Sequence, residues 1–193
     1  MRLNLTLEQA LEKARPGLRY KMEQSVALLR KAEKLALRYD PEEGFWLAFS
    51  GGKDSQTLYH IAELSGVKFK GHFSPTTVDP PQLIRFIRRY YPEVDFTKVE
   101  KSIYQMAKEK KMPPTQRLRW CCAEFKEQGG AGKVTLTGVR RQESVRRAKR
   151  QSVEVSGHKF AGELGEFEQW SEEKIRKKYK NINQDEFTRE KQQ

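Results

Sequence analysis

Cysteine is scarce in this sequence. The 193 residues include only two cysteines, the neighbours Cys121 and Cys122. Adjacent cysteines rarely meet the geometric requirements of a disulfide bond. We therefore expect no disulfide framework, and a reducing compartment is the better prediction.

Long hydrophobic runs are also missing. No stretch of about 18 apolar residues occurs, so a transmembrane helix is not expected. The N-terminal residues Met1-Arg2-Leu3-Asn4 do not begin the apolar segment of a secretory signal. Together with the scarcity of cysteine, these absences predict a cytoplasmic protein that has no membrane partner.

Histidine is equally rare. His60, His72 and His158 are far apart in the sequence, whereas protein ligands of a metal commonly recur a few residues apart. We therefore predict no site in which side chains of this chain alone hold a metal ion.

Positive charge, by contrast, is abundant. Lysine and arginine number 38 against 26 aspartates and glutamates, which gives a formal net charge of +12. Such an excess attracts anions, and either nucleic acid or a phosphate-rich small molecule would satisfy it. Because the basic residues are spread along the whole chain, a generally solvated charged surface is an equal alternative.

Apolar runs alternate with helical patterns along the middle of the chain. Residues 45–49 form a continuous apolar run typical of a buried strand. Further strand patterns follow at 67–73, weakly at 94–99, and at 133–137, which is the clearest late strand. The intervening segments carry apolar residues at helical spacing, and Pro80-Pro81 mark one helix start. This alternation predicts a doubly wound, mostly parallel α/β sheet of about five strands with helices on both faces.

The same patterns predict three regions. Residues 1–43 are expected to form an N-terminal helical extension, with a helix over 18–39. Residues 44–150 are expected to form a nucleotide-binding α/β domain. Residues 151–193 are polar with few apolar anchors, which favours a segment that is partly disordered or truncated.

A glycine-rich loop lies between the 45–49 strand and the helix that follows it. Its residues are Ser50, Gly51, Gly52, Lys53, Asp54 and Ser55. Glycine lets the backbone approach an anion closely, and a helix N-terminus offers unpaired N–H groups and the positive end of the helix dipole. Lys53 adds a positive charge, while Asp54 suits either a Mg²⁺ ligand or a helix cap. The pattern predicts a phosphate-binding loop, and an ordinary Gly-Gly turn is the structural alternative.

This loop is not a Walker A motif. Leu47 and Asp54 occupy the positions where that motif requires glycine and serine or threonine. Residues 49–55 instead resemble the PP-loop of the ATP pyrophosphatase superfamily. The resemblance implies an adenine nucleotide α-hydrolase-like fold and a loop that holds the pyrophosphate end of ATP. ATP would be cleaved between its α- and β-phosphates, with Lys53 and Asp54 in catalytic roles.

A second motif spans residues 117–126. It brings together Arg119, Trp120, Cys121 and Cys122. Arginine can fork onto phosphate or sulfate oxygens, tryptophan can stack on a base, and thiols can ligate a metal or react covalently. The motif therefore suits substrate binding, and a packing cluster flanked by surface charge is the alternative.

A third motif, residues 138–147, follows the last predicted strand. Ligands of open α/β sheets gather at the carboxyl ends of the strands. We therefore expect Gly138 in the nucleotide site and Arg140 beside the nucleotide as a catalytic candidate. Glu143, Ser144 and Arg147 are further substrate candidates, although the later cations could equally form a solvated helix face.

The three motifs, in this order, resemble the phosphoadenosine phosphosulfate (PAPS) reductase family over about residues 45–150. By this resemblance, the 50–55 loop binds nucleotide phosphates, and Arg119 and Arg140 face the anionic groups of the substrate. Thr76, Thr77 and Asp79 would line the same cleft.

The sequence also departs from that family. Sulfonucleotide reductases usually alter the Lys-Asp-Ser ending of the loop, whereas Lys53 is intact here, which favours ATP. Their late nucleophilic cysteine has no counterpart after Cys122, and the second cysteine pair of a [4Fe–4S] site is missing, so no iron–sulfur cluster is expected from this chain alone. A closing Pro/Trp segment is absent too, which leaves a truncated chain, a reduced paralogue and a partner-dependent protein as open alternatives.

Three functions follow from these features. The leading one is an ATP- and Mg²⁺-dependent enzyme that adenylates a substrate, in sulfur metabolism or sulfur transfer. The second is a PAPS or adenylyl-sulfate reductase that works with thioredoxin. The third is a non-catalytic subunit that binds a nucleotide or nucleic acid. A partner protein that supplies sulfur or completes the site, and a homo-oligomer, are further expectations.

Overall fold

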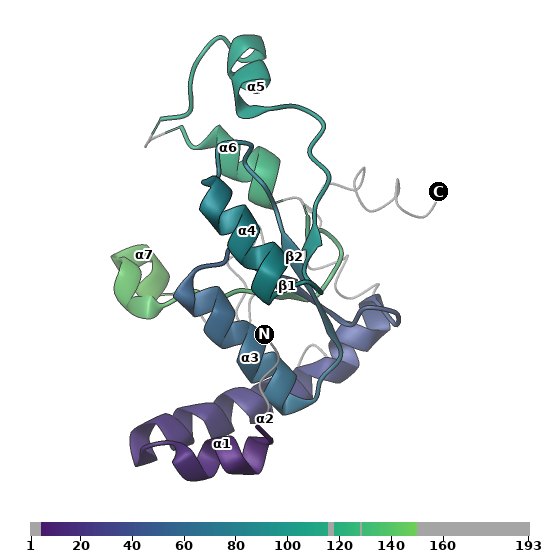
Figure 1. Cartoon of the computed structure of the whole chain (residues 1–193), viewed down its shortest axis with the longest axis vertical. Coiled ribbons are helices and arrows are strands. Elements are labelled where there is room, and N and C mark those ends of the chain that lie inside the picture. Colours follow the sequence, from purple (N-terminus) through teal and green to yellow (C-terminus); the bar gives the residue numbers. More distant parts are fainter. Residues whose placement is uncertain (1–4, 116–117, 128, 150–193) are drawn as a thin grey trace. The chain divides into compact units, whose positions relative to one another are not determined.

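The computed structural model describes residues 5–115, 118–127 and 129–149. The chain divides into two compact units, residues 1–138 and 139–193, and each is described by itself. The sheet belongs to the first unit (Figure 1).

Two helices precede the sheet. α1 (Leu7–Lys13) begins at a capping box, and α2 (Pro16–Tyr39) buries one apolar stripe. α2 contacts α3 (Lys53–Ser65), the helix that follows the first strand of the sheet. Arg30 Nε of α2 donates a hydrogen bond to the Ser65 carbonyl oxygen at 3.0 Å. The helix predicted over 18–39 is therefore confirmed. α1 was not predicted separately, although its Thr6-x-x-Gln9 pattern is a helix-start signature.

All four strands in the described part of the chain are parallel. They are β1 (Phe45–Ala48), β2 (Phe69–Phe73), β3 (Asp95–Phe96) and β4 (Thr135–Leu136), in the order β3-β2-β1-β4. The predicted parallel α/β sheet is confirmed. The two outer strands are shorter than their sequence patterns, since each pairs with only one neighbour over two residues.

The connections place the helices in layers. α3 joins β1 to β2, and α4 (Pro81–Tyr90) joins β2 to β3. Both crossovers advance in the same direction, so both helices cover the same face (Figure 1). The chain then passes through α5 (Ile103–Glu109), α6 (Trp120–Cys122) and a π-helical turn (Ala123–Glu127) before β4. This return reaches the opposite face, where a Cβ atom at Gly129 would lie 3.1 Å from the Trp46 ring.

An aromatic cluster joins α3 and α4 to the end of β1. The Phe49 ring meets Tyr59 of α3 edge-on at 5.7 Å and Tyr91, just after α4, at 4.7 Å between ring centroids. Phe49 and Tyr91 are each 3% exposed. Buried aromatic pairs of this kind combine large apolar area with defined geometry. The segment after Phe49 is therefore anchored where it leaves the sheet.

The opposite face of the sheet carries a polar cluster. Trp46 stacks on His72 with ring centroids 3.3 Å apart, and Lys133 Nζ lies 2.8 Å from Asp40 and 3.0 Å from Glu43. Burial lowers the pKa of His72, and the hydrogen bond from Lys133 lowers the pKa of Asp40. These contacts connect the turn before β1 to β2 and to the segment that enters β4.

Candidate functional site

The loop between β1 and α3 turns sharply at Gly51. Phe49 N–H still pairs with the His72 carbonyl oxygen at 2.8 Å, and Gly51 then takes a φ of +72°. A Cβ atom at Gly51 would lie 2.5 Å from Leu83 Cδ1 of α4. The left-handed backbone therefore favours glycine at this position, and a Cβ atom here would also force the Leu83 side chain to shift.

Two serines close the loop on itself. Ser55 is 5% exposed, and its hydroxyl accepts a hydrogen bond from Ser50 N–H at 3.2 Å and donates one to the Gly52 carbonyl oxygen at 2.9 Å. The Ser50 hydroxyl lies 3.1 Å from Ser55 Oγ. The loop conformation is thus fixed by its own side chains.

The first turn of α3 offers the features of an anion site. Gly52 is the N-cap residue and makes no side-chain cap, and the first N–H groups of a helix have no acceptor within the helix itself. Lys53 is exposed beside them, and Asp54 is half-buried in the same turn. Backbone donors, the helix dipole and a mobile cation can together hold phosphate oxygens.

β4 ends against this turn. A Cβ atom at Gly138 would lie 3.0 Å from the Asp54 carbonyl oxygen, so glycine permits the close approach. β1 pairs with β2 on one side and β4 on the other, which makes the β1–β4 gap the point where the strand order reverses. Ligands of open α/β sheets bind at this kind of position. The structure therefore brings the predicted loop and Gly138 together.

The residues predicted after β2 make local contacts. Thr76 N–H donates to the Asp79 carboxylate. Thr77 has a φ of +66°, which is costly for a residue other than glycine, and its hydroxyl accepts a hydrogen bond from Ile103 N–H at the start of α5 at 2.9 Å. This loop is thus shaped by its own side chains and by α5, and its role in lining a nucleotide cleft remains a prediction.

The Arg119–Cys122 motif lies in α6 and the turn before it. Arg119 is exposed and donates from Nη2 to Cys122 Sγ at 3.3 Å. Lys110 lies over the Trp120 ring at 5.6 Å and pairs with Glu124 at 2.8 Å. These contacts connect the motif to the end of α5 rather than to the loop. Within the described residues, the buried Trp120 Nε1 has no hydrogen-bond partner, so the motif carries an indole donor that no acceptor satisfies.

The described part of the second unit gathers the remaining predicted residues. The Glu143 carboxylate pairs with Arg147 and lies 3.7 Å from Arg140 Nη2. Ser144 caps α7 (Val145–Ala148) by accepting a hydrogen bond from Arg147 N–H at 3.2 Å. Glu143 thus holds two of the predicted cations next to each other, and their roles toward a substrate remain predictions.

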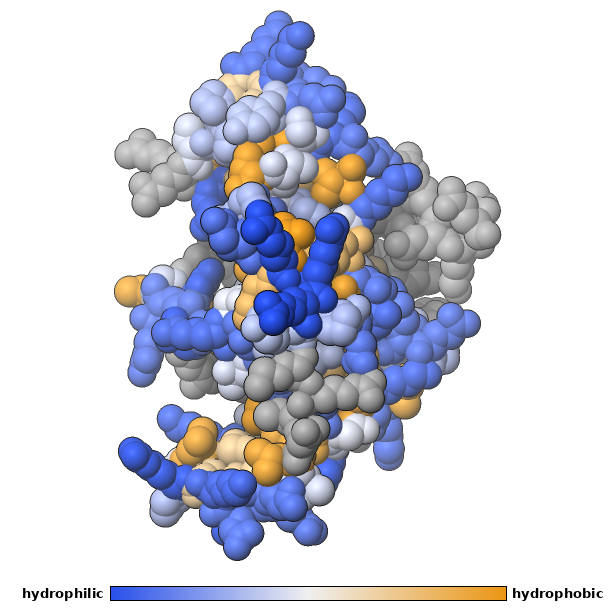
Figure 2. Space-filling model, viewed as in Figure 1, coloured by the Kyte–Doolittle hydropathy of each residue, from blue (hydrophilic) through white to orange (hydrophobic). Residues whose placement is uncertain are grey.

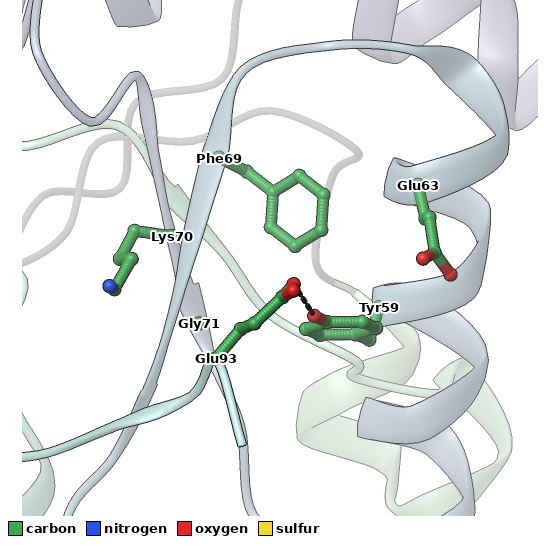
Figure 3. Close-up of a pocket in the computed structure, with 6 residues that line it drawn as sticks. All are labelled: Tyr59, Glu63, Phe69, Lys70, Gly71 and Glu93. Carbon is green, nitrogen blue, oxygen red and sulfur yellow. Dashed lines mark hydrogen bonds between the residues drawn. The ribbon is translucent and has the colours of Figure 1, made fainter. Parts of the chain in front are cut away.

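A separate open hollow of about 450 Å³ lies between α3 and β2 (Figure 3). Its lining residues are Tyr59, Glu63, Phe69, Lys70, Gly71 and Glu93. The Tyr59 hydroxyl donates to Glu93 at 3.5 Å, and the Lys70 side chain extends away from Tyr59 on the other side of the strand (Figure 3). The hollow includes the beginning of β2 and none of the predicted site residues, so it is distinct from the loop.

Two residues that the motifs did not identify support the loop, Gln56 directly and Tyr91 through Gln56. Gln56 Nε2 donates to the Gly51 carbonyl oxygen at 2.8 Å, and the Tyr91 hydroxyl donates to Gln56 Oε1 at 3.2 Å. Gln56 directly follows the predicted loop, which is a weak signal. Tyr91 is 35 residues from Gln56, and no local pattern indicates their contact.

Two further observations concern membranes and metals. Among the helices of the described ranges, none is long and apolar enough to cross a bilayer. The described side chains also include no cluster of three or more histidines, cysteines, aspartates or glutamates able to hold a metal ion.

Comparison with known proteins identifies the family. The family model for the phosphoadenosine phosphosulfate reductase domain matches residues 44–183, which is most of the chain. No curated protein and no solved structure shows significant similarity to this chain. The match covers the sheet, the glycine-rich loop and both downstream motifs, so this chain belongs to the phosphoadenosine phosphosulfate reductase family.

Proposed function

We propose that this protein binds ATP through residues 50–55 and cleaves it between the α- and β-phosphates to adenylate a substrate in sulfur metabolism or sulfur transfer. The nucleophile of the acceptor attacks the α-phosphorus, the bond to the bridging oxygen breaks, and pyrophosphate leaves. The positive charge of Lys53 would stabilise the charge that develops on the departing pyrophosphate.

The geometry of the loop carries this proposal. Gly51, Ser50 and Ser55 hold the backbone in one conformation, and the first turn of α3 presents N–H donors beside the exposed Lys53. Donors fixed before the ligand arrives require little reorganisation when charge develops. A loop that served only as a turn would not need this combination.

We propose that Mg²⁺ accompanies the nucleotide at the same turn. Asp54 supplies one half-buried carboxylate next to Lys53, and Mg²⁺ commonly binds one or two carboxylates together with substrate phosphates. The ion would neutralise charge on the phosphates when bound. In this proposal Asp54 would orient the nucleotide together with the ion.

The intact loop distinguishes ATP from a sulfonucleotide. In this proposal Lys53 would meet the β- and γ-phosphates of ATP, and PAPS and adenylyl sulfate have no such tail. This feature favours ATP cleavage over sulfite release.

The test is a product assay with ATP labelled in the α-phosphate, in the presence of Mg²⁺ and candidate acceptors. The proposal predicts AMP or an adenylated product together with pyrophosphate, and loss of both in Lys53→Ala. Sulfite release from PAPS or adenylyl sulfate with thioredoxin, without pyrophosphate release from ATP, would establish the reductase alternative instead.

A second candidate function, nucleic-acid binding, is favoured by the outer face of α4. Arg85, Arg88 and Arg89 are all exposed and share one side of the helix at i, i+3 and i+4. α4 contains no acidic residue. Figure 2 shows the most hydrophilic side chains gathered over this region of the molecule.

No carboxylate neutralises these arginines among the described residues. Arg88 lies over the Phe96 ring at 5.3 Å, and Arg89 lies over the Tyr90 ring, which is 38% exposed, at 5.5 Å. Arginines stacked on rings keep their N–H edges available for phosphate oxygens. We infer that this face binds the backbone of a nucleic acid, next to the helix side that contacts Gly51 through Leu83.

Salt dependence tests this second function. The variant Arg85→Gln/Arg88→Gln/Arg89→Gln should reduce the slope of log K against log salt by about 2 for single strands and about 3 for duplex DNA. A matched α2 variant, Lys21→Gln/Lys31→Gln/Lys34→Gln, removes the same charge from exposed positions and should keep the slope. Equal slopes for the two variants would contradict a dedicated α4 surface.

A further inference from the structure

A chain of side-chain hydrogen bonds leads away from the glycine-rich loop. Gln56 Nε2 lies 2.8 Å from the Gly51 carbonyl oxygen, and Gln56 Oε1 lies 3.2 Å from the Tyr91 hydroxyl. His60 Nε2 lies 3.1 Å from the same hydroxyl, and His60 Nδ1 lies 3.2 Å from Glu63 Oε2. Five residues on α3, on the loop and after α4 are therefore linked in sequence.

The direction of each hydrogen bond follows from the first one. The Gly51 carbonyl oxygen can only accept, so the Gln56 amide nitrogen donates and its oxygen faces Tyr91. The Tyr91 hydroxyl, which has a single proton, must then donate its hydrogen bond to Gln56 Oε1. Burial raises the pKa of Tyr91, with a smaller contribution from Glu63, so the hydroxyl keeps that proton at neutral pH.

His60 completes the chain only in one protonation state. Because Tyr91 donates to Gln56, its oxygen can only accept from His60, and Nε2 must carry a proton. Nδ1 faces the Glu63 carboxylate, which also only accepts, so Nδ1 must carry a proton as well. All four contacts are therefore favourable together only when the imidazole is positively charged.

Loss of a proton from His60 would disturb the chain at one end or the other. With the remaining proton on Nε2, a lone pair on Nδ1 would face the Glu63 carboxylate. With the remaining proton on Nδ1, Nε2 would compete with Gln56 for the Tyr91 proton. In the second case Gln56 loses the partner that orients its amide toward Gly51.

We propose that Gln56, Tyr91 and His60 are positioning residues that couple the conformation of the loop at Gly51 to the charge on His60, so that nucleotide is held most tightly when His60 is protonated. This inference rests on the proposed nucleotide site. The groups that meet His60 are Glu63 on its own helix, Tyr91 after α4 and the Tyr59 ring at 5.7 Å. Two charged groups on neighbouring segments have other partners. Arg30 of α2 donates a hydrogen bond to the Ser65 carbonyl oxygen, and Glu93 accepts one from the Tyr59 hydroxyl.

The experiment measures ATP affinity by calorimetry from about pH 5.5 to 8.5 in four proteins: wild type, Tyr91→Phe, His60→Gln and Tyr59→Phe. Wild type should bind ATP about two- to tenfold more tightly than Tyr91→Phe at low pH, and the two should converge at high pH. His60→Gln keeps an amide donor toward Tyr91 that does not titrate, so its affinity relative to Tyr91→Phe should not change with pH. Ionisation of ATP itself is common to all four proteins and cancels in these ratios.

Tyr59→Phe is the matched control. Tyr59 is also a buried tyrosine, at 7% exposure, and its hydroxyl donates to Glu93 (Figure 3). Its pH profile should follow that of wild type. A constant ratio of wild type to Tyr91→Phe across the pH range would overturn the proposal, as would a wild-type profile in His60→Gln.

Nitrogen chemical shifts of the His60 ring provide a readout that does not depend on the Tyr91 variant folding. In the ATP complex at low pH both ring nitrogens should be protonated, and a neutral ring there would refute the coupling. Absence of ATP binding by wild type at every pH would instead refute the proposed function, so the two failures are distinguishable.

Discussion

The glycine-rich loop and the Arg119–Cys122 motif differ in how the fold holds them. The loop is fixed at both ends, by Phe49 in the aromatic core and by the buried Ser55, and its backbone conformation is set by Gly51. The motif lies in a three-residue helix followed by a π-helical turn, with an exposed arginine and half-buried thiols.

This difference separates two chemical tasks. Binding phosphates requires N–H donors that are already oriented, and the first turn of α3, which follows β1, supplies them. The motif offers groups that could react with or recognise a substrate, but its side-chain contacts within the described residues lead to its own turn and to the end of α5. The proposed nucleotide site is therefore part of the scaffold, whereas the groups proposed to meet the acceptor lie on a short segment outside the sheet.

The largest effect is expected at Gly51. Gly51→Ala combines a left-handed backbone with a methyl group 2.5 Å from Leu83 Cδ1. It should destabilise the fold by about 2–4 kcal/mol, as measured by urea denaturation, and abolish ATP binding.

The double variant Gly51→Ala/Leu83→Ala separates the two causes, because it removes the overlap and keeps the backbone strain. Gly52→Ala is the matched control, since only Ser50 Oγ, at 3.4 Å, lies near its Cβ position and its φ is −77°. It should cost below about 1 kcal/mol. Equal losses in Gly51→Ala and Gly52→Ala would mean that the loop is not held as described.

The next effect is on affinity and not on stability. Lys53 is exposed, so Lys53→Ala should leave the unfolding midpoint unchanged. It should weaken ATP binding about 10- to 100-fold, because losing a hydrogen bond to a charged group reduces affinity by about that factor. Calorimetry measures both quantities. A Lys68→Ala variant removes an exposed lysine that donates to the Pro41 carbonyl oxygen, away from the loop, and should bind ATP like wild type.

Acid should affect the opposite face of the sheet in two stages. The pKa of His72 is lowered by burial from 6.5, so the unfolded chain takes up a proton first and stability falls as the pH drops below 6.5. The pKa of Asp40 is lowered from 3.8 mainly by Lys133, so its contribution is lost as the pH falls further, below 3.8. Urea denaturation across this range should show both decreases.

Two variants test which residue causes each decrease in stability. His72→Phe keeps a ring next to Trp46 and should remove the upper decrease only, whereas Asp40→Asn should remove the lower one only. Unchanged pH profiles in both variants would contradict this account of the cluster.

The smallest effect is expected in the motif. Cys122 is half-buried and accepts one hydrogen bond, from an exposed arginine. Cys122→Ser should change the free energy of unfolding by about 0.5 kcal/mol or less and leave ATP affinity within about twofold. A large loss of ATP affinity would show that the motif and the loop form one site and would break the comparison made above.

Much of the fold could be predicted because its signals are local. The 45–49 apolar run, the glycine pair after it and the helical spacing of the following residues each fix one element, and parallel pairing follows from their alternation. The lengths of β3 and β4 could not be predicted, because they depend on neighbours far away in the sequence. The contacts of Gly51 with Leu83 and of Gln56 with Tyr91 were missed for the same reason.

The most direct test of the nucleotide site compares the affinities of ATP and AMP in wild type and in Lys53→Ala. If the loop holds the β- and γ-phosphates, wild type should bind ATP at least about tenfold more tightly than AMP, and Lys53→Ala should lose most of that advantage. Equal affinities for ATP and AMP in wild type would contradict the proposal that residues 50–55 bind the β- and γ-phosphates of ATP.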